Sequence, residues 1–549
     1  MSSFNKFETH PSPIMDAIAY YLFESENISN VCRVLYDVNT FWRKIAIEYG
    51  CKEINLTLSG DNGLCGWKLE YLPSNIKIDK SICYCFVKEV WIKLDSSYLE
   101  DKEALQKLAK FWPSNIFFST ARRVLIYLDD GFGDYIATSE SEGTIFLDIA
   151  KCVIRSMPKL QEARIWNEAR IIDPYKANNC LSGGCCFDKL FSAILPKVKR
   201  LDIDLDCVKL PKSPSCLKNN TGLTSINYGS HNYFDVLQQL VERSALTLKS
   251  LSVYEFTVNA VVYILYNSKG GTIIYPQLEK LVLCSHNTED DFPALESLES
   301  VIPFPILKYL YMDALYLFAD DAPFRGNSGS LKYLELGCDD EFLRIAQKYE
   351  IFQHGQYQNL QCISLNFIRT DGRTNEDNEL LLQFGLGLAS PATQTFEFTN
   401  VSGNAIFKNL PEYPYMANLQ ILKMNFVKIT LSNIITLLKL FPNLIEITCD
   451  IDGLGAELDA INYGNLPAEL YSRNYPLNRF FKRLTICKFT YPYSVYAISA
   501  ILLAIICPRF TLLTIKGHYL DKYYEELAST ISTSPFSDYA DRVKHLLKK

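Results

Sequence analysis

The sequence of 549 residues has no block of basic residues, although it contains 55 lysines and arginines. These residues are scattered among 62 acidic ones, and the formal net charge is −7. Proteins that bind nucleic acids concentrate positive charge on one face, against the phosphate backbone. Anionic membrane surfaces likewise attract basic chains rather than acidic ones. The composition therefore predicts neither a nucleic-acid partner nor a membrane partner.

A long apolar run is also missing. The segment VYAISAILLAIIC, Val495–Cys507, ends before Pro508, whereas a membrane-spanning helix needs roughly 20 apolar residues. We therefore expect a buried helix there, leading into the strand RFTLLTI. The first residues, MSSFNKFETHPSP, lack the charged and then apolar pattern of a signal peptide. This start predicts a cytoplasmic or nuclear protein.

Catalytic and metal-binding patterns are absent as well. The six histidines show no H-E-x-x-H spacing, and the 17 cysteines include no C-x-x-C pair. FGLGLAS, around Gly385, lacks the third glycine of a dinucleotide-binding loop. DIDLD, Asp202–Asp206, is followed by Cys207 where a calcium loop needs glycine, so it is interpreted as a strand. These observations predict a chain without enzymatic activity, cofactor or metal; the rival class is an enzyme on an unrecognised α/β fold.

What the sequence does contain is a repeated frame. In YPQLEKLVL, Tyr275–Leu283, apolar residues occupy positions 1, 4 and 6 of the frame, which are Leu278, Leu281 and Leu283. Sixteen such frames follow one another at intervals of 24 to 39 residues. Their position 1 residues are Cys51, Val87, Ala121, Leu160, Val198, Leu223, Leu248, Leu278, Leu307, Leu331, Leu360, Thr393, Leu419, Leu444, Phe481 and Phe510.

Proline marks where many of these frames begin. Seven of the sixteen have proline two residues before position 1, where 23 prolines placed at random would put fewer than one. Proline lacks an N–H group and disfavours helix for the residue before it, so it can end a helix and start a strand. Side chains alternate along a strand, so positions 4 and 6 share one face and position 5 lies on the other. Helical spacing precedes several frames, as in FDKLFSAIL, FDVLQQLVERS and TLSNIITLLKLF.

A helix, a proline turn and a strand repeated in this way resemble a leucine-rich-repeat solenoid. The resemblance implies an α/β fold with a curved parallel sheet and outer helices, in which neighbouring repeats bury each other's apolar faces. The array is expected over residues 51–517, followed by a C-terminal helical cap over 518–549. The alternative is an ordinary α/β domain with parallel strands and covering helices.

Residues 1–50 precede the first frame and have helical spacing instead. HPSPIMDAIAYYL, His10–Leu22, places apolar residues on one helical face, and a later cluster closes with Trp42 and Arg43. This pattern resembles an F-box motif. Followed by leucine-rich repeats, it is similar to the F-box/leucine-rich-repeat proteins, particularly their divergent fungal members. The residues that match the motif are Pro11, Ile14, Met15, Ile18, Leu22 and Trp42.

The resemblance implies the substrate-recognition subunit of a cullin-RING, SCF-type ubiquitin ligase. The matching residues would dock onto the small adaptor subunit of the ligase, and the repeats would hold a protein substrate. The alternative is that the same residues only cover the core of the first repeat. The chain would then be a non-enzymatic interaction scaffold without a link to ubiquitin.

Position 5 of each frame is expected to line the concave face of the sheet, where a rigid surface can concentrate binding energy. Trp91, Arg164 and Tyr311 are the preferred anchors, because these residue types are enriched at binding hot spots. Asp204 is two residues after Asp202 on the same strand, so the two side chains share one face. The alternative for each residue is a solvated side chain without a ligand. The position 5 residues include Asn55, Trp91, Arg164, Asp202, Asn227, Ser252, Tyr311, Glu335, Ser364, Lys423, Thr448 and Thr514.

Overall fold

The computed structural model divides into two compact units, Met1–Leu278 (unit 1) and Glu279–Lys549 (unit 2), which are described separately. Residues 1–52 and 516–549, which hold the F-box-like segment and the expected C-terminal cap, lie outside the described residues. The structure describes residues 53–59, 66–69, 89–94, 118, 120–128, 154–167, 191–204, 222–229, 234–254, 260–284, 302–313, 329–338, 357–367, 382–399, 417–453, 478–487 and 493–515.

Unit 1 contains a row of parallel strands that pair in sequence order. The pairs run β1 with β3, β3 with β4, and so on to β7 with β8. One strand departs from the predicted frames, because β2 pairs antiparallel with β1. The elements are β1 (Glu53–Ser59), β2 (Gly66–Leu69), β3 (Glu89–Leu94), β4 (Arg123–Leu128), β5 (Glu162–Asn167), β6 (Arg200–Asp204), β7 (Ser225–Tyr228), α9 (Phe234–Ser244), β8 (Ser250–Val253) and α10 (Ala260–Leu265).

Unit 2 repeats the same arrangement, with each strand from β9 to β17 pairing in parallel with the next. Its longest strand, β14, carries a register shift between Lys423 and Lys428 where it pairs with β15. The elements are β9 (Lys280–Leu283), β10 (Tyr309–Asp313), β11 (Tyr333–Cys338), β12 (Cys362–Phe367), β13 (Thr395–Thr399), β14 (Ile421–Ile429), α16 (Leu431–Leu440), β15 (Glu446–Ile451), β16 (Arg483–Ile486), α19 (Tyr493–Ile506) and β17 (Leu512–Ile515).

The sixteen frames agree with these strands residue by residue. In every frame the strand begins two residues after position 1, from Glu53 after Cys51 to Leu512 after Phe510. The predicted α/β arrangement, with one parallel strand per repeat, is therefore confirmed within each unit. Positions 4 and 6 are buried, as the alternation requires, in every frame where the structure describes their side chains; in β11 these are Leu334 and Leu336.

A backbone hydrogen-bond pattern joins consecutive repeats within each unit at the start of their strands, from the Ala121 repeat to the Leu248 repeat and from the Leu278 repeat to the Phe510 repeat. The carbonyl at position 2 accepts hydrogen bonds from the N–H groups at positions 2 and 3 of the following repeat. Glu279 O, for example, accepts from Lys308 N and Tyr309 N, both at 2.9 Å. The turn before the strand is closed in the same regular way, since the position 1 N–H of Leu444 donates to Phe441 O.

Thr393, which departs from the apolar character of position 1, is fully buried. Its hydroxyl donates to Leu360 O, the position 1 carbonyl of the preceding repeat, at 2.9 Å. A buried hydroxyl without a partner would cost free energy, and this bond removes that cost. The threonine can therefore replace a leucine without breaking the repeat.

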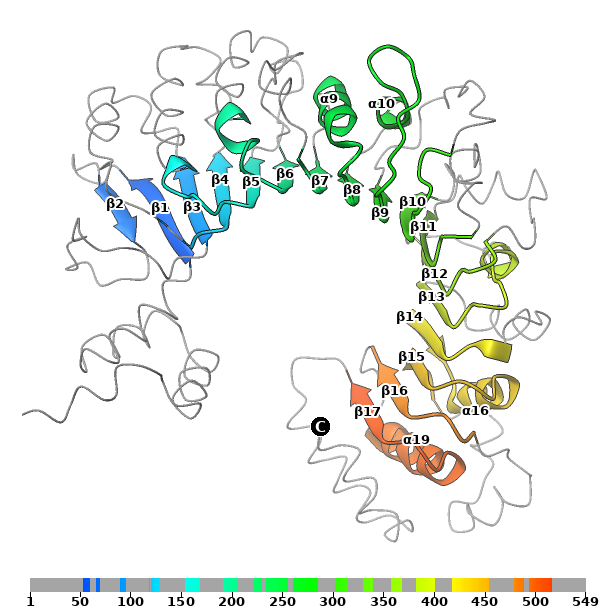
Figure 1. Ribbon diagram of the computed structural model, residues 1–549. Helices are drawn as coiled ribbons and strands as arrows, with labels where there is room; N and C mark the ends of the chain where they lie inside the picture. Colours follow the sequence, from blue (N-terminus) through cyan, green and yellow to red (C-terminus); the bar gives the residue numbers. More distant parts are fainter. Residues whose placement is uncertain are drawn as a thin grey trace, which may run out of the picture. The chain divides into compact units, whose positions relative to one another are not determined.

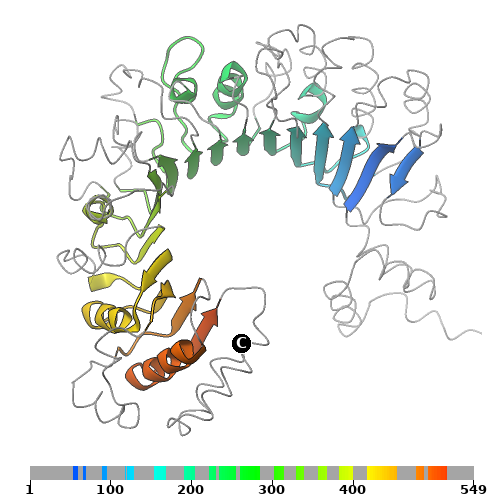
Figure 2. The ribbon, with the colours of Figure 1, turned by 180° about the vertical axis from the view of Figure 1, so that it is seen from behind.

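The described helices cover one face of the strands in each unit. α9 and α10 lie on one side of the strands of unit 1, and α16 and α19 lie on one side of the strands of unit 2 (Figures 1 and 2). Thr430 caps the start of α16, since its side chain accepts a hydrogen bond from Asn433 N, and the helix buries Leu431, Ile434 and Leu438. α19 confirms the helix expected from VYAISAILLAIIC. Within the described part of the chain, no helix is long and apolar enough to span a membrane.

Candidate functional site

The candidate site is the strand face opposite the described helices, formed by the side chains at positions 3, 5 and 7 of the frames. We call it the open face. Register aligns position 5 across each unit, as predicted. In unit 1 this row is Asn55, Trp91, Leu125, Arg164, Asp202, Asn227 and Ser252. In unit 2 it is Val282, Tyr311, Glu335, Ser364, Glu397, Lys423, Thr448, Thr485 and Thr514.

The structure brings some of the predicted site residues together and separates others. Arg164 and Asp202 are neighbours in register, and Tyr311 is the register partner of Glu335. Trp91 is separated from Arg164 by Leu125 of β4. Asp204 lies in the row of position 7, one pleat beyond Asp202 on the same face. The predicted set therefore forms two pairs with two further residues nearby, rather than one cluster.

A charged row runs across β3, β4 and β5 at position 3. Arg123 donates to Glu89 at 2.9 Å and contacts Glu162 at 3.1 Å. The other oxygen of Glu89 accepts from the indole Nε1–H of Trp91 at 2.5 Å. Burial disfavours the charge on Arg123, but the two carboxylates outweigh it and raise the pKa of the guanidinium. The Trp91 indole is thus held on the open face by a carboxylate that is already neutralised.

Arg164 connects a carboxylate with an aromatic ring. Its Nε lies 3.4 Å from Asp202 Oδ2, and its guanidinium carbon lies 5.4 Å from the ring centroid of Trp166. Trp166 in turn makes an edge contact with Tyr127, with ring centroids 5.2 Å apart. Burial raises the pKa of Asp202, while Arg164 and a hydrogen bond from Asn227 act against that rise. The ion pair with Asp202 on β6 and the cation–π contact with Trp166 on its own strand therefore hold Arg164 in place on the open face.

In unit 2, Tyr311 lies among polar groups at the carboxyl ends of β9, β10 and β11. The thiol of Cys284 lies 3.9 Å from the Tyr311 hydroxyl. Burial raises the pKa of Tyr311, and the charges of Asp313 and Glu335 raise it further. Gly337 leaves room for Asp313, because a β carbon on Gly337 would lie 2.5 Å from Asp313 Oδ1. Tyr311 therefore remains a neutral hydroxyl at physiological pH.

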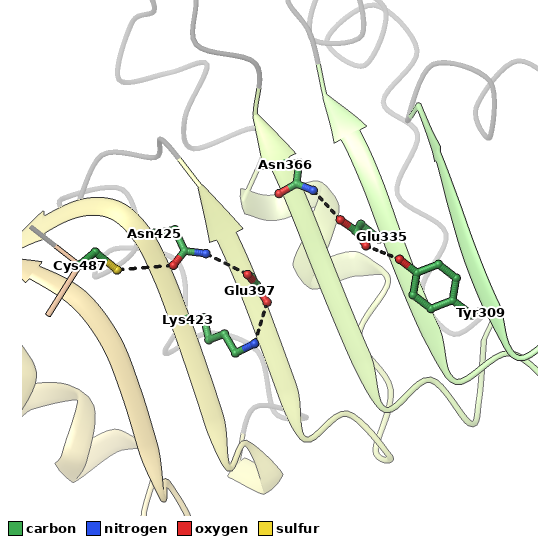
Figure 3. Close-up of polar contacts among 7 residues, drawn as sticks. All are labelled: Tyr309, Glu335, Asn366, Glu397, Lys423, Asn425 and Cys487. Atoms are coloured by element: carbon green, nitrogen blue, oxygen red, sulfur yellow. Dashed lines mark hydrogen bonds and ion pairs between the residues drawn. The ribbon is translucent and has the colours of Figure 1, made fainter. Parts of the chain in front are cut away.

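Glu335 is held by two neutral donors from the strands on either side. The hydroxyl of Tyr309 on β10 donates to Oε2 at 2.5 Å, and Nδ2 of Asn366 on β12 donates to Oε1 at 2.7 Å. Figure 3 shows the carboxylate between the two side chains. Each carboxylate oxygen has a second lone pair for a further donor. The carboxylate is therefore oriented before any ligand is present.

Glu397, two strands further on, is held differently. Lys423 Nζ lies 3.1 Å from Oε2, and Asn425 Nδ2 donates to Oε1 at 2.8 Å (Figure 3). Asn425 Oδ1 contacts the thiol of Cys487 at 3.6 Å. Burial disfavours the charged form of Lys423, but the hydrogen bond to Glu397 outweighs the effect of burial and raises the pKa of the amine. The negative charge of Glu397 is thus compensated inside the chain.

Apart from Asp204, sequence reasoning missed the open-face residues outside position 5. Tyr127 and Trp166 lie at position 7, while Glu89, Arg123 and Tyr309 lie at position 3. The period of two along a strand places all of these on the face of position 5, so the signal was present in the sequence. At position 5 itself, Glu397 and Thr485 were also missed.

The described open face has the chemistry of a recognition surface. It combines exposed aromatic rings with oriented carboxylates, amides and guanidinium groups. Among the residues whose positions the structure gives, no group of three His, Cys, Asp or Glu side chains could hold a metal ion. All six histidines fall outside those residues.

No protein-family model matches the chain, and no curated protein is a significant match to it.

Proposed function

We propose that this chain is a non-enzymatic, intracellular leucine-rich-repeat protein that binds a protein substrate through its open face. In this proposal it acts as the substrate-recognition adaptor of a cullin-RING, SCF-type ubiquitin ligase. The first fifty residues, through Ile14, Ile18, Leu22 and Trp42, are the docking module for the ligase adaptor subunit.

One observation carries the binding part of the proposal. The position 5 side chains of consecutive repeats are aligned in register within each unit, so the repeats present rows of recognition groups on a stiff backbone. Parallel strands tied by hydrogen bonds hold such side chains with little conformational freedom. These side chains therefore lose little conformational entropy when a protein ligand binds. The expected contacts are Trp91, Arg164, Asp202, Asp204, Tyr311 and Glu335.

The ubiquitin-ligase part rests on the F-box-like sequence of the first fifty residues. If these residues instead cover the core of the first repeat, the chain is an interaction scaffold. Docking needs accessible apolar side chains, whereas covering a core consumes them. The two alternatives therefore differ in whether Ile18 and Leu22 can be contacted by another protein.

A binding assay with the purified ligase adaptor subunit tests the docking module. The intact chain should retain the adaptor subunit on beads, and removal of residues 1–50 should abolish retention. Ile18→Glu in the full chain should do the same, because a charge in an apolar interface is costly. Ile274→Glu is the matched control, since Ile274 is 50% exposed on unit 1 and lies outside the module.

No retention by the intact, folded chain would rule out the adaptor role and leave the scaffold. Equal retention by Ile18→Glu and the intact chain would show that binding does not use the F-box-like residues. Circular dichroism and thermal unfolding of each variant establish that the chain is folded.

A further inference from the structure

Most carboxylates at positions 3 and 5 of the open face are paired with a Lys or Arg side chain. Six Glu or Asp side chains are described at positions 3 and 5, and five of them lie within 3.4 Å of a Lys or Arg nitrogen. In each case the partner comes from a neighbouring strand. The five pairs are Glu89 with Arg123, Glu162 with Arg123, Asp202 with Arg164, Glu397 with Lys423, and Glu446 with Arg483.

Glu335 is the exception among these six described carboxylates. Its two contacts, Tyr309 and Asn366, are neutral, and no described Lys or Arg forms an ion pair with it. The open-face positions of β10 to β13 carry Asp313, Glu335 and Glu397 and contain no Lys or Arg. A half-buried carboxylate is less hydrated than one in water, so leaving its charge uncompensated is unfavourable. A cation from outside the chain would remove that cost.

The surroundings of Glu335 suit a cationic side chain. Tyr333 lies two residues before Glu335 on the same strand face and is 46% exposed. Its ring lies 6.5 Å from that of Tyr309, tilted by 33°. The amine of Lys280 already lies 4.9 Å from the ring centroid of Tyr309, which shows that a tyrosine ring of this surface accepts a cation.

We propose that Glu335 and Tyr333 form a receptor site for an arginine or lysine side chain of the protein ligand. Arginine fits best, because its planar guanidinium can stack on an aromatic ring while it donates to a carboxylate. The Tyr309 and Asn366 contacts orient the carboxylate, so binding requires little rearrangement (Figure 3). The site rests on the proposed binding role of the open face, and it is independent of the ubiquitin-ligase link.

Fluorescence polarisation with synthetic peptides on the full-length chain tests this site. The probe is a fluorescein-labelled dodecapeptide of alternating Arg and Ser. Its counterpart carries citrulline, which keeps the shape of arginine without the charge. We expect the arginine peptide to bind and the citrulline peptide to bind at least about tenfold more weakly.

Two glutamine variants separate the site from general charge attraction. Glu335→Gln should weaken binding of the arginine peptide about tenfold, the loss expected for a charge-assisted hydrogen bond. It can keep both internal contacts, because the tyrosine hydroxyl accepts as well as donates. Glu279→Gln changes the net charge equally, but Glu279 lies at position 2, outside the open face, and pairs with Lys308 at 3.2 Å, so binding should stay within about twofold.

Tyr333→Ala provides a second measurement on the same site. It should weaken the arginine peptide about threefold or more through the lost ring contact, since Tyr333 is exposed and its removal leaves the core intact. Equal weakening by Glu335→Gln and Glu279→Gln would mean that only the net charge matters, and it would overturn the proposal. Failure of the folded wild-type chain to prefer the arginine peptide over the citrulline peptide would overturn it too.

These outcomes are separable from those of the docking experiment. The peptide assay contains no ligase component, so a chain that fails to retain the adaptor subunit can still show the Glu335-dependent preference. Conversely, loss of that preference leaves docking through the first fifty residues unaffected.

Discussion

Gly385 lies so close to Leu365 that a β carbon built on the glycine would stand 2.2 Å from Leu365 Cδ1. The same β carbon would be 3.1 Å from Phe396 Cζ. Leu365 and Phe396 have no exposed surface, so neither side chain has room to move away. Gly385 sits in the helical turn over residues 382–387. Glycine is needed there because a helix packs directly onto β12 and β13.

Replacing this glycine should destabilise the chain. Alanine is the better helix former by about 1 kcal/mol, but overpacking a rigid core costs about 1–3 kcal/mol. We expect Gly385→Ala to lower the free energy of unfolding by roughly 1–2 kcal/mol, measured as a lower midpoint of urea unfolding. Gly329→Ala is the control, because no atom lies within 4 Å of its added β carbon. An unchanged midpoint for Gly385→Ala would contradict this prediction and mean that the Leu365 side chain can shift to make room for the added methyl group.

Asn478 supports a second stability prediction. It is 4% exposed, and its Oδ1 accepts from Phe480 N and Phe481 N at 2.9 Å each. Its Nδ2 donates to Phe441 O at 3.3 Å. Asn478→Ala would leave buried backbone groups without partners, at a cost of about 2 kcal/mol in unfolding free energy.

Asn418→Ala is the comparison for this prediction. Asn418 is exposed and donates one bond, to Pro391 O at 3.0 Å, which water can replace. Its loss should therefore cost less than about 1 kcal/mol. Equal shifts of the urea midpoint in the two variants would contradict the importance of burial at Asn478.

The repeat register was predictable from sequence because it depends on local chemistry. Apolar residues at positions 4 and 6 must face the helices, and proline can stop a helix before the strand. The resulting frames placed the start of every described strand except β2, including the one after the polar Thr393. The same alternation placed Glu335 on the open face as the register partner of Tyr311.

Other features depend on contacts between distant residues, which a single frame does not encode. β2 pairs antiparallel with β1 because Gly66–Leu69 folds back, although no frame covers it. The need for Gly385 appears only when Leu365 and Phe396 are packed against it. Likewise, Glu335 and Glu397 look alike in sequence, and only their neighbours' side chains distinguish a paired carboxylate from an unpaired one.

Cys362 should be a poorly reactive thiol. Burial raises its pKa to about 11, and the charge of Glu397 contributes. The thiolate is the reacting form, so at pH 8 only about a thousandth of the Cys362 thiols can react. Iodoacetamide should modify Cys362 slowly in the folded chain and readily in guanidinium chloride, as followed by peptide mass spectrometry. Glu397→Gln should speed the folded-state reaction, and rapid labelling of the folded wild type would contradict the burial argument.

The pH dependence of stability at Asp202 tests whether burial or the charge of Arg164 has the larger effect on the pKa of this carboxyl. Burial raises the pKa of the carboxyl above its ordinary value of 3.8, and Arg164 opposes that rise without overcoming it. A raised pKa means that the folded state holds the proton more tightly than the unfolded state does. The stabilising contribution of Asp202 is therefore complete below about pH 4 and is lost as pH rises through the folded-state pKa.

Asp202→Asn removes this titration while keeping a polar group beside Asn227. We expect the stability of the wild type relative to Asp202→Asn to fall as pH rises from about 4 through the folded-state pKa, in urea unfolding at a series of pH values. At pH 7 the two should differ by less than about 1 kcal/mol, because the Arg164 side chain is 44% exposed and water screens the pair. A relative stability that instead rises over this window would mean that the ion pair outweighs burial. Arg164 would then act mainly as the partner of Asp202, with less freedom to contact a ligand.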